Sequence, residues 1–361
     1  MNLDLHEHKQ RPRSILVIRL SSLGDVVLTT PIVRQLQRSF PHAFVDVMVA
    51  ERFSEVYAHN PRVRRIWSAM GSTTVDTDLD KRKLEILETV PQGRYDLVVD
   101  LQHSMQSAAI RRGMGNAVVI YPKFRWQKLA MVWLKRFPAI TTSIVERYRM
   151  PLQEFPLVLD TEGPEVWLES ERDQGYYAPR SQALPMHGTN HNDMPLHPSV
   201  AIAVGAHHAT KRWPVEYFAQ LCKMLVGQGA RVMLIGGVAD VALCDAVSAM
   251  AGVGIERRDG AATLAKTIEV LDSADVLVTN DSGVMHLGAA RRVPTVAIFG
   301  STVRQLGFEP FGTRYVVVEH DVRCRPCSHI GRAKCPKGHF KCMIEIKPQA
   351  VFDAVRNLLG Q

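Results

Sequence analysis

Residues 278–300 read Val278-Thr-Asn-Asp281-Ser282-Gly283-Val-Met-His286-Leu-Gly-Ala-Ala-Arg-Arg-Val-Pro294-Thr-Val-Ala-Ile-Phe-Gly300. An apolar strand runs into a polar turn, an alanine-rich helix follows, and a second apolar strand ends at Gly300, which predicts one strand–helix–strand unit. In open α/β sheets, ligands bind outside the carboxyl ends of the strands, and the N–H groups at the start of a helix attract phosphate. The turn therefore predicts an anion site, with His286 one helical turn further on. The alternative is a capped helix with a core histidine.

Strand and helix patterns alternate on both sides of this unit. Apolar strands are expected at 15–20, 45–49 and 97–101, and a second series begins with strands at 200–204 and 231–235. Such alternation predicts α/β architecture, with mostly parallel sheets covered by helices on both faces. Proline, glycine and short polar residues dominate residues 179–198, as in an exposed linker. We therefore expect two Rossmann-like domains, at 13–178 and 199–347, and a last helix in 348–361.

The composition limits the class of protein. The chain has 361 residues, 46% of them hydrophobic, and a formal net charge of +8. This charge favours an anionic partner, such as nucleic acid, an acidic membrane surface or a phosphorylated substrate. No apolar run reaches the length of about 18 residues that predicts a transmembrane helix. The N-terminal residues lack the apolar centre of a secretory signal, so we expect a cytoplasmic protein.

Four blocks, taken in order, resemble the heptosyltransferases, glycosyltransferase family 9. They are Arg19-Leu-Ser-Ser-Leu-Gly24-Asp25 followed by Thr29-Thr30-Pro31, then Thr210-Lys211-Arg212-Trp213-Pro214, then Leu234-Ile-Gly236-Gly237, and finally Asn280-Asp281-Ser282-Gly283-Val-Met-His286-Leu. The resemblance implies a GT-B fold, in which two Rossmann-like domains face each other across a cleft. It also implies an inverting, metal-independent transfer of heptose from ADP-heptose to the lipopolysaccharide inner core, on an acceptor of the lipid A-Kdo type.

The first block supplies a candidate general base. An inverting transfer needs a base for the proton of the acceptor hydroxyl and a cation for the departing diphosphate. Asp25 matches the position of the family's base, and Ser22 and Gly24 lie in the same acceptor-side loop. The alternative for Asp25 is a cap at the N-terminus of a helix.

The other blocks supply candidate donor-binding residues. By the resemblance, Lys211 contacts the diphosphate, although a solvated loop lysine is the alternative. Asp240 is either a ribose ligand or the N-cap of the following helix. The remaining candidates on the donor side are Thr210, Gly236, Gly237, Asp281, Ser282, Gly283 and His286.

A basic stretch separates the first two blocks. Residues 111–149 contain nine Lys or Arg residues and one acidic residue, Glu146. Apolar residues fall at helical spacing within it, among them Trp126, Leu129, Ala130, Trp133, Leu134 and Phe137. A basic amphipathic helix can lie on an anionic membrane or pack its apolar face on a sheet. The resemblance favours contact of its basic residues, including Arg125 and Lys128, with the acceptor or with the inner membrane surface.

Four cysteines cluster near the C-terminus as Cys324-x-x-Cys327-(x7)-Cys335-(x6)-Cys342. The spacing is that of a small zinc site, and stable disulfides are not expected in a reducing cytoplasm. The loop 324–342 is therefore expected to hold either a structural zinc ion or four free thiols. Catalysis requires no cofactor in either case.

Three other functions compete with the heptosyltransferase. A related family 9 enzyme using another nucleotide sugar fits the same blocks. A zinc-containing nucleic-acid-binding protein fits the charge and the cysteines, but the chain lacks aromatic RNA-binding signatures and any named DNA-reading finger spacing. A Rossmann oxidoreductase would carry a G-x-G-x-x-G turn where this chain has Ser-Ser-Leu-Gly-Asp. We therefore expect no nucleic-acid partner.

Overall fold

The computed structural model describes residues 12–69, 93, 95–135, 142–179 and 197–360. Contacts divide the chain into two compact units, one formed by Met1–Lys123 with Ile144–Tyr177 and the other by Phe124–Ser143 with Ala178–Gln361. Most of the expected linker, 179–198, lies outside the described residues, as does Phe137. The boundaries of independently folding domains, at 13–178 and 199–347, stay a prediction.

The first unit is built on a parallel sheet. Its strands are β1 (Ser14–Ile18), β2 (Phe44–Ala50), β3 (Arg65–Ala69), β4 (Tyr95–Asp100) and β5 (Gly115–Ile120), in the order β3-β2-β1-β4-β5. The helices are α2 (Leu23–Val27), α3 (Thr30–Ser39), α5 (Met105–Arg111), α7 (Ile144–Arg149) and α8 (Glu169–Gln174), with 3-10 turns η1 (Glu51–Val56) and η2 (Met150–Leu152). Leu16 and Ile18 of β1 pack against Ile110 of α5 in one buried cluster.

A buried arginine holds the segment around α7 and α8 on this unit. Arg34 of α3 is 1% exposed, and its guanidinium lies 2.6 Å from Asp160 and 3.0 Å from Glu165. A buried arginine must be paired to be tolerated, so the two carboxylates fix the path of the chain after α7. Helix α7, which carries Tyr148, is tied to α3 by a bond of 3.0 Å from Nε of Arg149 to Oε1 of Gln35.

The second unit also contains a parallel sheet. Its strands are β6 (Ser199–Ala203), β7 (Arg231–Gly237), β8 (Glu256–Ala261), β9 (Val276–Asn280), β10 (Thr295–Phe299) and β11 (Tyr315–Glu319), in the order β11-β10-β9-β6-β7-β8. The helices are α6 (Arg125–Trp133), α9 (Val215–Gly227), α10 (Val241–Ala251), α11 (Leu264–Asp272), α12 (Gly283–Ala290), α13 (Lys341–Ile344) and α14 (Pro348–Leu359), with 3-10 turns η3 (Ala209–Lys211), η4 (Val238–Asp240) and η5 (Arg304–Leu306).

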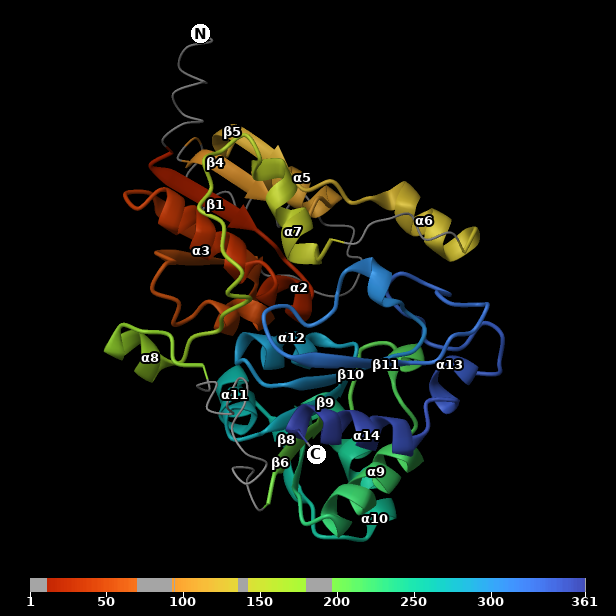
Figure 1. The fold of residues 1–361 in the computed structure, drawn as a ribbon. Coiled ribbons are helices and arrows are strands. Elements are labelled where there is room, and N and C mark those ends of the chain that lie inside the picture. Colours follow the sequence, from red (N-terminus) through yellow and green to blue (C-terminus); the bar gives the residue numbers. More distant parts are fainter. Residues whose placement is uncertain (1–11, 70–92, 94, 136–141, 180–196, 361) are drawn as a thin grey trace. The chain divides into compact units, whose positions relative to one another are not determined.

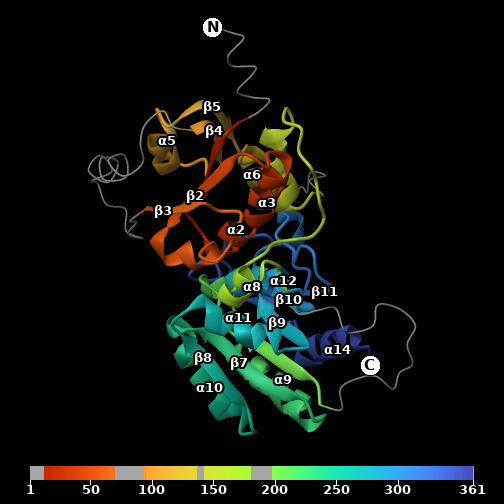
Figure 2. The ribbon, with the colours of Figure 1, turned by 90° about the vertical axis from the view of Figure 1, so that its left-hand side faces the viewer.

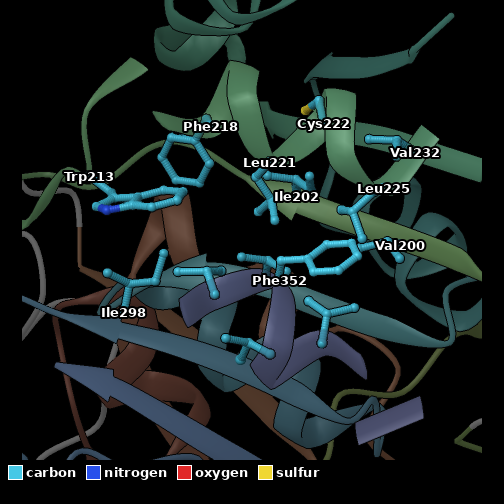
Figure 3. Close-up of a cluster of buried hydrophobic side chains, with 14 of the residues drawn as sticks. Val200, Ile202, Trp213, Phe218, Leu221, Cys222, Leu225, Val232, Ile298 and Phe352 are labelled. Atoms are coloured by element: carbon cyan, nitrogen blue, oxygen red, sulfur yellow. The ribbon is translucent and has the colours of Figure 1, made fainter. Parts of the chain in front are cut away.

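Helices cover both faces of the second sheet. In Figures 1 and 2 the sheet lies between α9, α10 and α14 on one side and α11 and α12 on the other. Successive residues of β10 pack on opposite faces of the sheet. Ile298 belongs to the cluster with α9 and α14, whereas Phe299 packs with Met285 of α12. Figure 3 shows Phe218 and Leu221 of α9 and Phe352 of α14 in the larger cluster. The predicted α/β class, with two Rossmann-like halves, is confirmed.

None of the helices in the described ranges combines the length and the apolar character needed to cross a lipid bilayer.

Candidate functional site

Each sheet has a topological switch point. In the first unit it lies between β1 and β4, and in the second between β6 and β9, because the chain winds outward in opposite directions from these neighbouring strands. Ligands of open α/β sheets bind outside the carboxyl ends of the strands at this point. Residues 19–25 follow β1, while residues 204–212 follow β6 and residues 281–283 follow β9. Three of the four predicted blocks therefore lie where the topology favours ligands, while Gly236 and Gly237 end the neighbouring strand β7.

Asp25 lies in the first turn of α2. Its Oδ2 accepts from the backbone N–H of Ser22 at 3.2 Å and from the Ser22 hydroxyl at 2.9 Å. Its Oδ1 lies 2.6 Å from Nη2 of Arg19 and accepts from the hydroxyl of Tyr148 at 3.1 Å. The bond from the Ser22 N–H is half of a capping box. Asp25 therefore has a capping role as the third residue of α2, while the N-cap itself is Ser22. A role as base stays a prediction.

Arg19 keeps the Asp25 carboxylate charged. Burial favours the neutral acid, but the charge of Arg19 and the hydrogen bonds from Ser22 outweigh it, so the pKa of Asp25 is lowered. Burial likewise opposes the charge of Arg19, yet Asp25 outweighs it and raises the arginine pKa. Arg19 is oriented by a second bond, from Nη1 to the carbonyl of Leu101 at the end of β4. At neutral pH, Asp25 is therefore an ionised and fixed carboxylate.

At the switch point of the second sheet, a lysine and a carboxylate form an ion pair. Nζ of Lys211, at the end of η3, lies 2.7 Å from Oδ2 of Asp281, and the two side chains are 16% and 8% exposed. Asn280 connects the same two loops, because its Oδ1 accepts from the N–H of Trp213 and its Nδ2 donates to the carbonyl of Val204. Two predicted donor-binding residues, Lys211 and Asp281, are thus brought into direct contact.

Two further hydroxyls contact the predicted donor-side residues Asp281 and Thr210, and neither was predicted from the sequence. Thr302 donates to Oδ2 of Asp281 at 2.6 Å, and Ser301 donates to the hydroxyl of Thr210 at 3.0 Å. Arg332 donates its backbone N–H to Thr210 Oγ1 and accepts from the Thr210 N–H. Ser301 and Thr302 follow β10 after a single residue, Gly300, so the rule that polar residues at strand ends approach ligands could have found them.

The turn after Asp281 leads into α12. Ser282 is extended and precedes the helix, and Gly283 is its first residue. These backbone groups stand at the helix N-terminus, where an anion is favoured. His286 is 3% exposed, and its ring lies 6.4 Å from that of Phe308. In this structure it is a buried histidine of the second helical turn.

The glycines at the end of β7 lie beside Asp240. A Cβ on Gly236 would lie 2.7 Å from the Cβ of Asp240, whereas Gly237 faces open space. The Asp240 carboxylate accepts from the N–H of Gly237 at 3.1 Å and makes no capping bond to α10. It therefore caps the short turn η4, and the space beside Gly236 is filled by protein.

The acceptor-side candidates are divided between the two units. Ser22 is exposed and Gly24 is buried, both at the start of α2. Arg125 and Lys128 lie on α6, which groups with the second unit. Arg125 is exposed and Lys128 is half-buried.

All four clustered cysteines line one small cavity, together with Thr210 and Ser301. The thiols form no disulfide, and Cys324 Sγ lies 3.7 Å from Nε2 of His339. Burial raises the pKa of Cys327 and, to about 11, that of Cys342. Among the described residues, no three His, Cys, Asp or Glu side chains are arranged to hold a metal ion. The loop is tied to the donor-side residues, because Cys327 donates its N–H to the carbonyl of Ser301.

Sequence comparison finds one family over most of the chain. The model for "Glycosyltransferase family 9 (heptosyltransferase)" matches residues 84–337. Lipopolysaccharide heptosyltransferase 2 of Escherichia coli K12 is 24% identical over 375 residues, which cover 96% of this chain and 99% of that protein. Lipopolysaccharide heptosyltransferase 1 of Pseudomonas aeruginosa is 29% identical over 334 residues, covering 87% and 85%.

Solved structures share the fold of this chain over nearly its whole length. A glycosyl transferase family 9 protein from Veillonella parvula has a TM-score of 0.72 at 21% identity, covering 97% of this chain and 98% of that one. An E. coli heptosyltransferase solved with ADP has a TM-score of 0.66 at 20% identity, covering 96% and 99%. The fold is shared with these proteins.

Proposed function

The chain belongs to glycosyltransferase family 9, the heptosyltransferases, and we propose that it transfers heptose from ADP-heptose to the inner core of lipopolysaccharide. The family makes it a glycosyltransferase. The donor, the acceptor and the inverting course without a catalytic metal are the proposed parts.

The pair Lys211–Asp281 carries the donor half of this function. An ammonium group has three N–H donors, and Asp281 engages one side of it at 2.7 Å. The other donors are then directed to the diphosphate of ADP-heptose, beside the N-terminus of α12. Thr302 holds the carboxylate of Asp281 and so fixes the direction of the ammonium group. The shared fold of a heptosyltransferase solved with ADP supports this assignment.

Asp25 carries the acceptor half. The oxygen of an acceptor hydroxyl attacks the anomeric carbon of the heptose and forms the new glycosidic bond, while Asp25 takes its proton. The bond from the anomeric carbon to the diphosphate breaks, and ADP leaves with the electron pair. A single displacement of this kind inverts the anomeric centre. Lys211 stabilises the charge that develops on the leaving ADP.

The surroundings of Asp25 indicate where the acceptor hydroxyl binds. Each carboxylate oxygen already has two donors, so the acceptor must replace one of them. Tyr148 is buried and the side chain of Arg19 is only 11% exposed. Ser22 is exposed, and its hydroxyl is free to rotate away from Oδ2. The acceptor hydroxyl therefore takes the place of the Ser22 hydroxyl, and Arg19 with Tyr148 holds the carboxylate in position.

A metal ion has no step in this reaction, because Lys211 and the start of α12 supply the positive charge. For the four cysteines we propose either a structural zinc ion, which takes no part in the reaction, or four free thiols. Four free thiols around one cavity match the donor set of such a site, although the side chains must turn toward one point to bind it. Zinc there would stiffen the loop that holds Thr210 through Arg332.

The proposed acceptor is a Kdo- or heptose-bearing lipid A. The relatives named as lipopolysaccharide heptosyltransferases support this acceptor, and the net charge of +8 suits a phosphorylated glycolipid. Such a lipid places the enzyme in the cytoplasm, in peripheral contact with the inner membrane.

Thermal unfolding with different nucleotides tests the donor. Melting temperatures are measured with ADP, UDP, GDP and NADH at equal concentrations. A shift with ADP alone is expected, since a ligand stabilises only the folded state that binds it. A larger shift with UDP or GDP would assign another nucleotide sugar, and a shift with NADH alone would overturn the proposal.

A further inference from the structure

Helix α6 exposes an aromatic face. Trp126 is 82% exposed and Trp133 is 77% exposed, with Leu129 between them at 43%. Residues at these spacings lie on one side of a helix, because each residue turns the direction by about 100°. Large apolar side chains grouped on one exposed face indicate an interaction site, whereas apolar residues scattered singly over a surface need no such explanation.

The opposite side of α6 is already fixed to the second unit. Met131 is 1% exposed and packs with Val303 and Leu306. Lys135, just after the helix, donates from Nζ to the carbonyls of Cys324 and Pro326 at 3.0 and 2.7 Å. The helix is thus anchored by one side, and among the described residues of this unit the tryptophans lie on its exposed side.

The charge around α6 selects the kind of partner. Residues 121–134 contain Lys123, Arg125 and Lys128 and no acidic residue, while the next cation, Lys135, is engaged on the anchored side. Arg125 is exposed at the edge of the aromatic face. A second copy of the chain would set like charges against each other across a two-fold axis. An anionic bilayer instead attracts the cations and accepts indole rings at the level of its headgroups.

We propose that the face formed by Trp126, Leu129 and Trp133 docks the protein on the surface of an anionic lipid bilayer. The helix lies in the plane of the interface, with both indoles among the headgroups and Arg125 beside lipid phosphates. This docking rests on the proposed function in one respect, namely that the acceptor is carried by a lipid. Because α6 packs on residues that follow Thr302, the docked face is connected to the donor-side loop.

Vesicle binding of the full chain tests the docking. Sedimentation is measured with vesicles of phosphatidylcholine alone and of phosphatidylcholine with phosphatidylglycerol, without donor or acceptor. Binding is expected to the anionic vesicles and to weaken as salt is added. The double variant Trp126→Gln with Trp133→Gln is expected to lower the partition coefficient at least about tenfold. Met250→Gln, which changes a residue 54% exposed on α10, is the matched control and should bind as the wild type does.

A fluorescence measurement keeps the test valid if the double variant folds poorly. Brominated lipids should quench the tryptophan emission of the wild type, and Leu129→Gln alone should weaken binding in the same direction. Wild-type protein that ignores anionic vesicles, or a folded double variant that binds them equally well, would overturn the proposal. A double variant that changes only the oligomeric state would instead assign the face to contact between copies.

Different experimental results would overturn the proposed docking and the proposed function. Vesicle binding through α6 without any heptose transfer would leave the docking and remove the function. Heptose transfer to a lipid acceptor by a protein that binds no anionic vesicle would remove the docking alone.

Discussion

Nζ of Lys211 lies 2.7 Å from Oδ2 of Asp281, and the two residues follow neighbouring strands at the switch point of the second sheet. The contact joins a loop after β6 to the turn after β9. A lysine held in this way presents its remaining donors in one direction, whereas a solvated loop lysine would not. The pair therefore supports the proposed role of Lys211 as a phosphate ligand over that of an ordinary surface lysine.

Removing the ammonium group should weaken ADP binding. Lys211→Met keeps the length of the side chain and loses the charge-assisted bond, so the Kd for ADP is expected to rise about 10- to 100-fold, and turnover to fall with it. Isothermal titration measures the first and ADP release the second. Lys223→Met, at an exposed lysine of α9, is the control. Unchanged affinity together with unchanged turnover would remove Lys211 from the site.

Thr302 is expected to influence donor binding through its hydrogen bond to Asp281. Thr302→Val keeps the shape of the side chain but removes the donor to Oδ2, so the KM for the donor is expected to rise several-fold. Thr302→Ser retains a hydroxyl and should restore the wild-type KM. If both variants lose stability but keep the same KM, the hydroxyl is structural and has no positioning role.

Asp25→Asn tests the base. The variant should bind ADP normally, because Asp25 belongs to the unit without the donor loops, and turnover should fall about 10²–10⁴-fold. Asp96→Asn serves as the control, since Asp96 accepts from the N–H groups of Arg13 and Ser14 in the same unit. It should reduce stability and leave turnover near wild type. Turnover of Asp25→Asn within a few-fold of wild type would leave only the capping role.

The pH dependence of kcat/KM should reveal the pairing of Arg19 with Asp25. Burial raises the pKa of Asp25, and Arg19 is the largest influence that lowers it. In the wild type, the carboxylate therefore stays ionised, and its protonation causes no loss of activity between about pH 8 and 5. Arg19→Met removes the largest influence that lowers the pKa of Asp25, so this pKa rises and the acid limb should move to higher pH. Arg38→Met, at a half-exposed pair with Glu162, should leave the profile unchanged. An acid limb at the same pH in both variants would show that Arg19 does not control Asp25.

Chelation should separate stability from catalysis. If Cys324, Cys327, Cys335 and Cys342 hold zinc, its removal should lower the melting temperature, because metal binding contributes to folding. Initial rates of the protein that remains folded should stay near those of the untreated enzyme. Elemental analysis after purification without added metal gives the occupancy. Zinc well below one equivalent, with four titratable thiols, would leave an ordinary cysteine-rich loop.

Local patterns predicted the elements that have buried faces. The unit at residues 278–300 is confirmed as β9, α12 and β10, because its apolar runs are fully buried between two helix layers. Strand β8 (Glu256–Ala261) was missed, since it is an edge strand with exposed charges and pairs only with β7. Ion pairs such as Arg231–Glu256 stabilise this strand, and a search for a regular spacing of apolar residues does not detect such pairs.

The site was predictable where its residues are close in sequence. Ser22 and Asp25 are three residues apart, the spacing of a capping box. Tyr148 reaches the same carboxylate from 123 residues away, and only the tertiary fold brings it there. For α6, helical spacing predicted the helix correctly, but its packing on the unit runs through Met131 rather than through the tryptophans. The side of a helix that packs depends on its neighbours, which a single sequence does not contain.

The most direct test of the central claim is mass spectrometry of a Kdo-bearing lipid A acceptor, incubated with ADP-heptose and the full chain in the presence of a chelator. The acceptor is expected to gain a heptose residue as an equal amount of ADP is released. With Asp25→Asn, the gain should be absent over the same time although ADP still binds. No heptose on the acceptor with the wild type, or undiminished transfer by Asp25→Asn, would contradict the account.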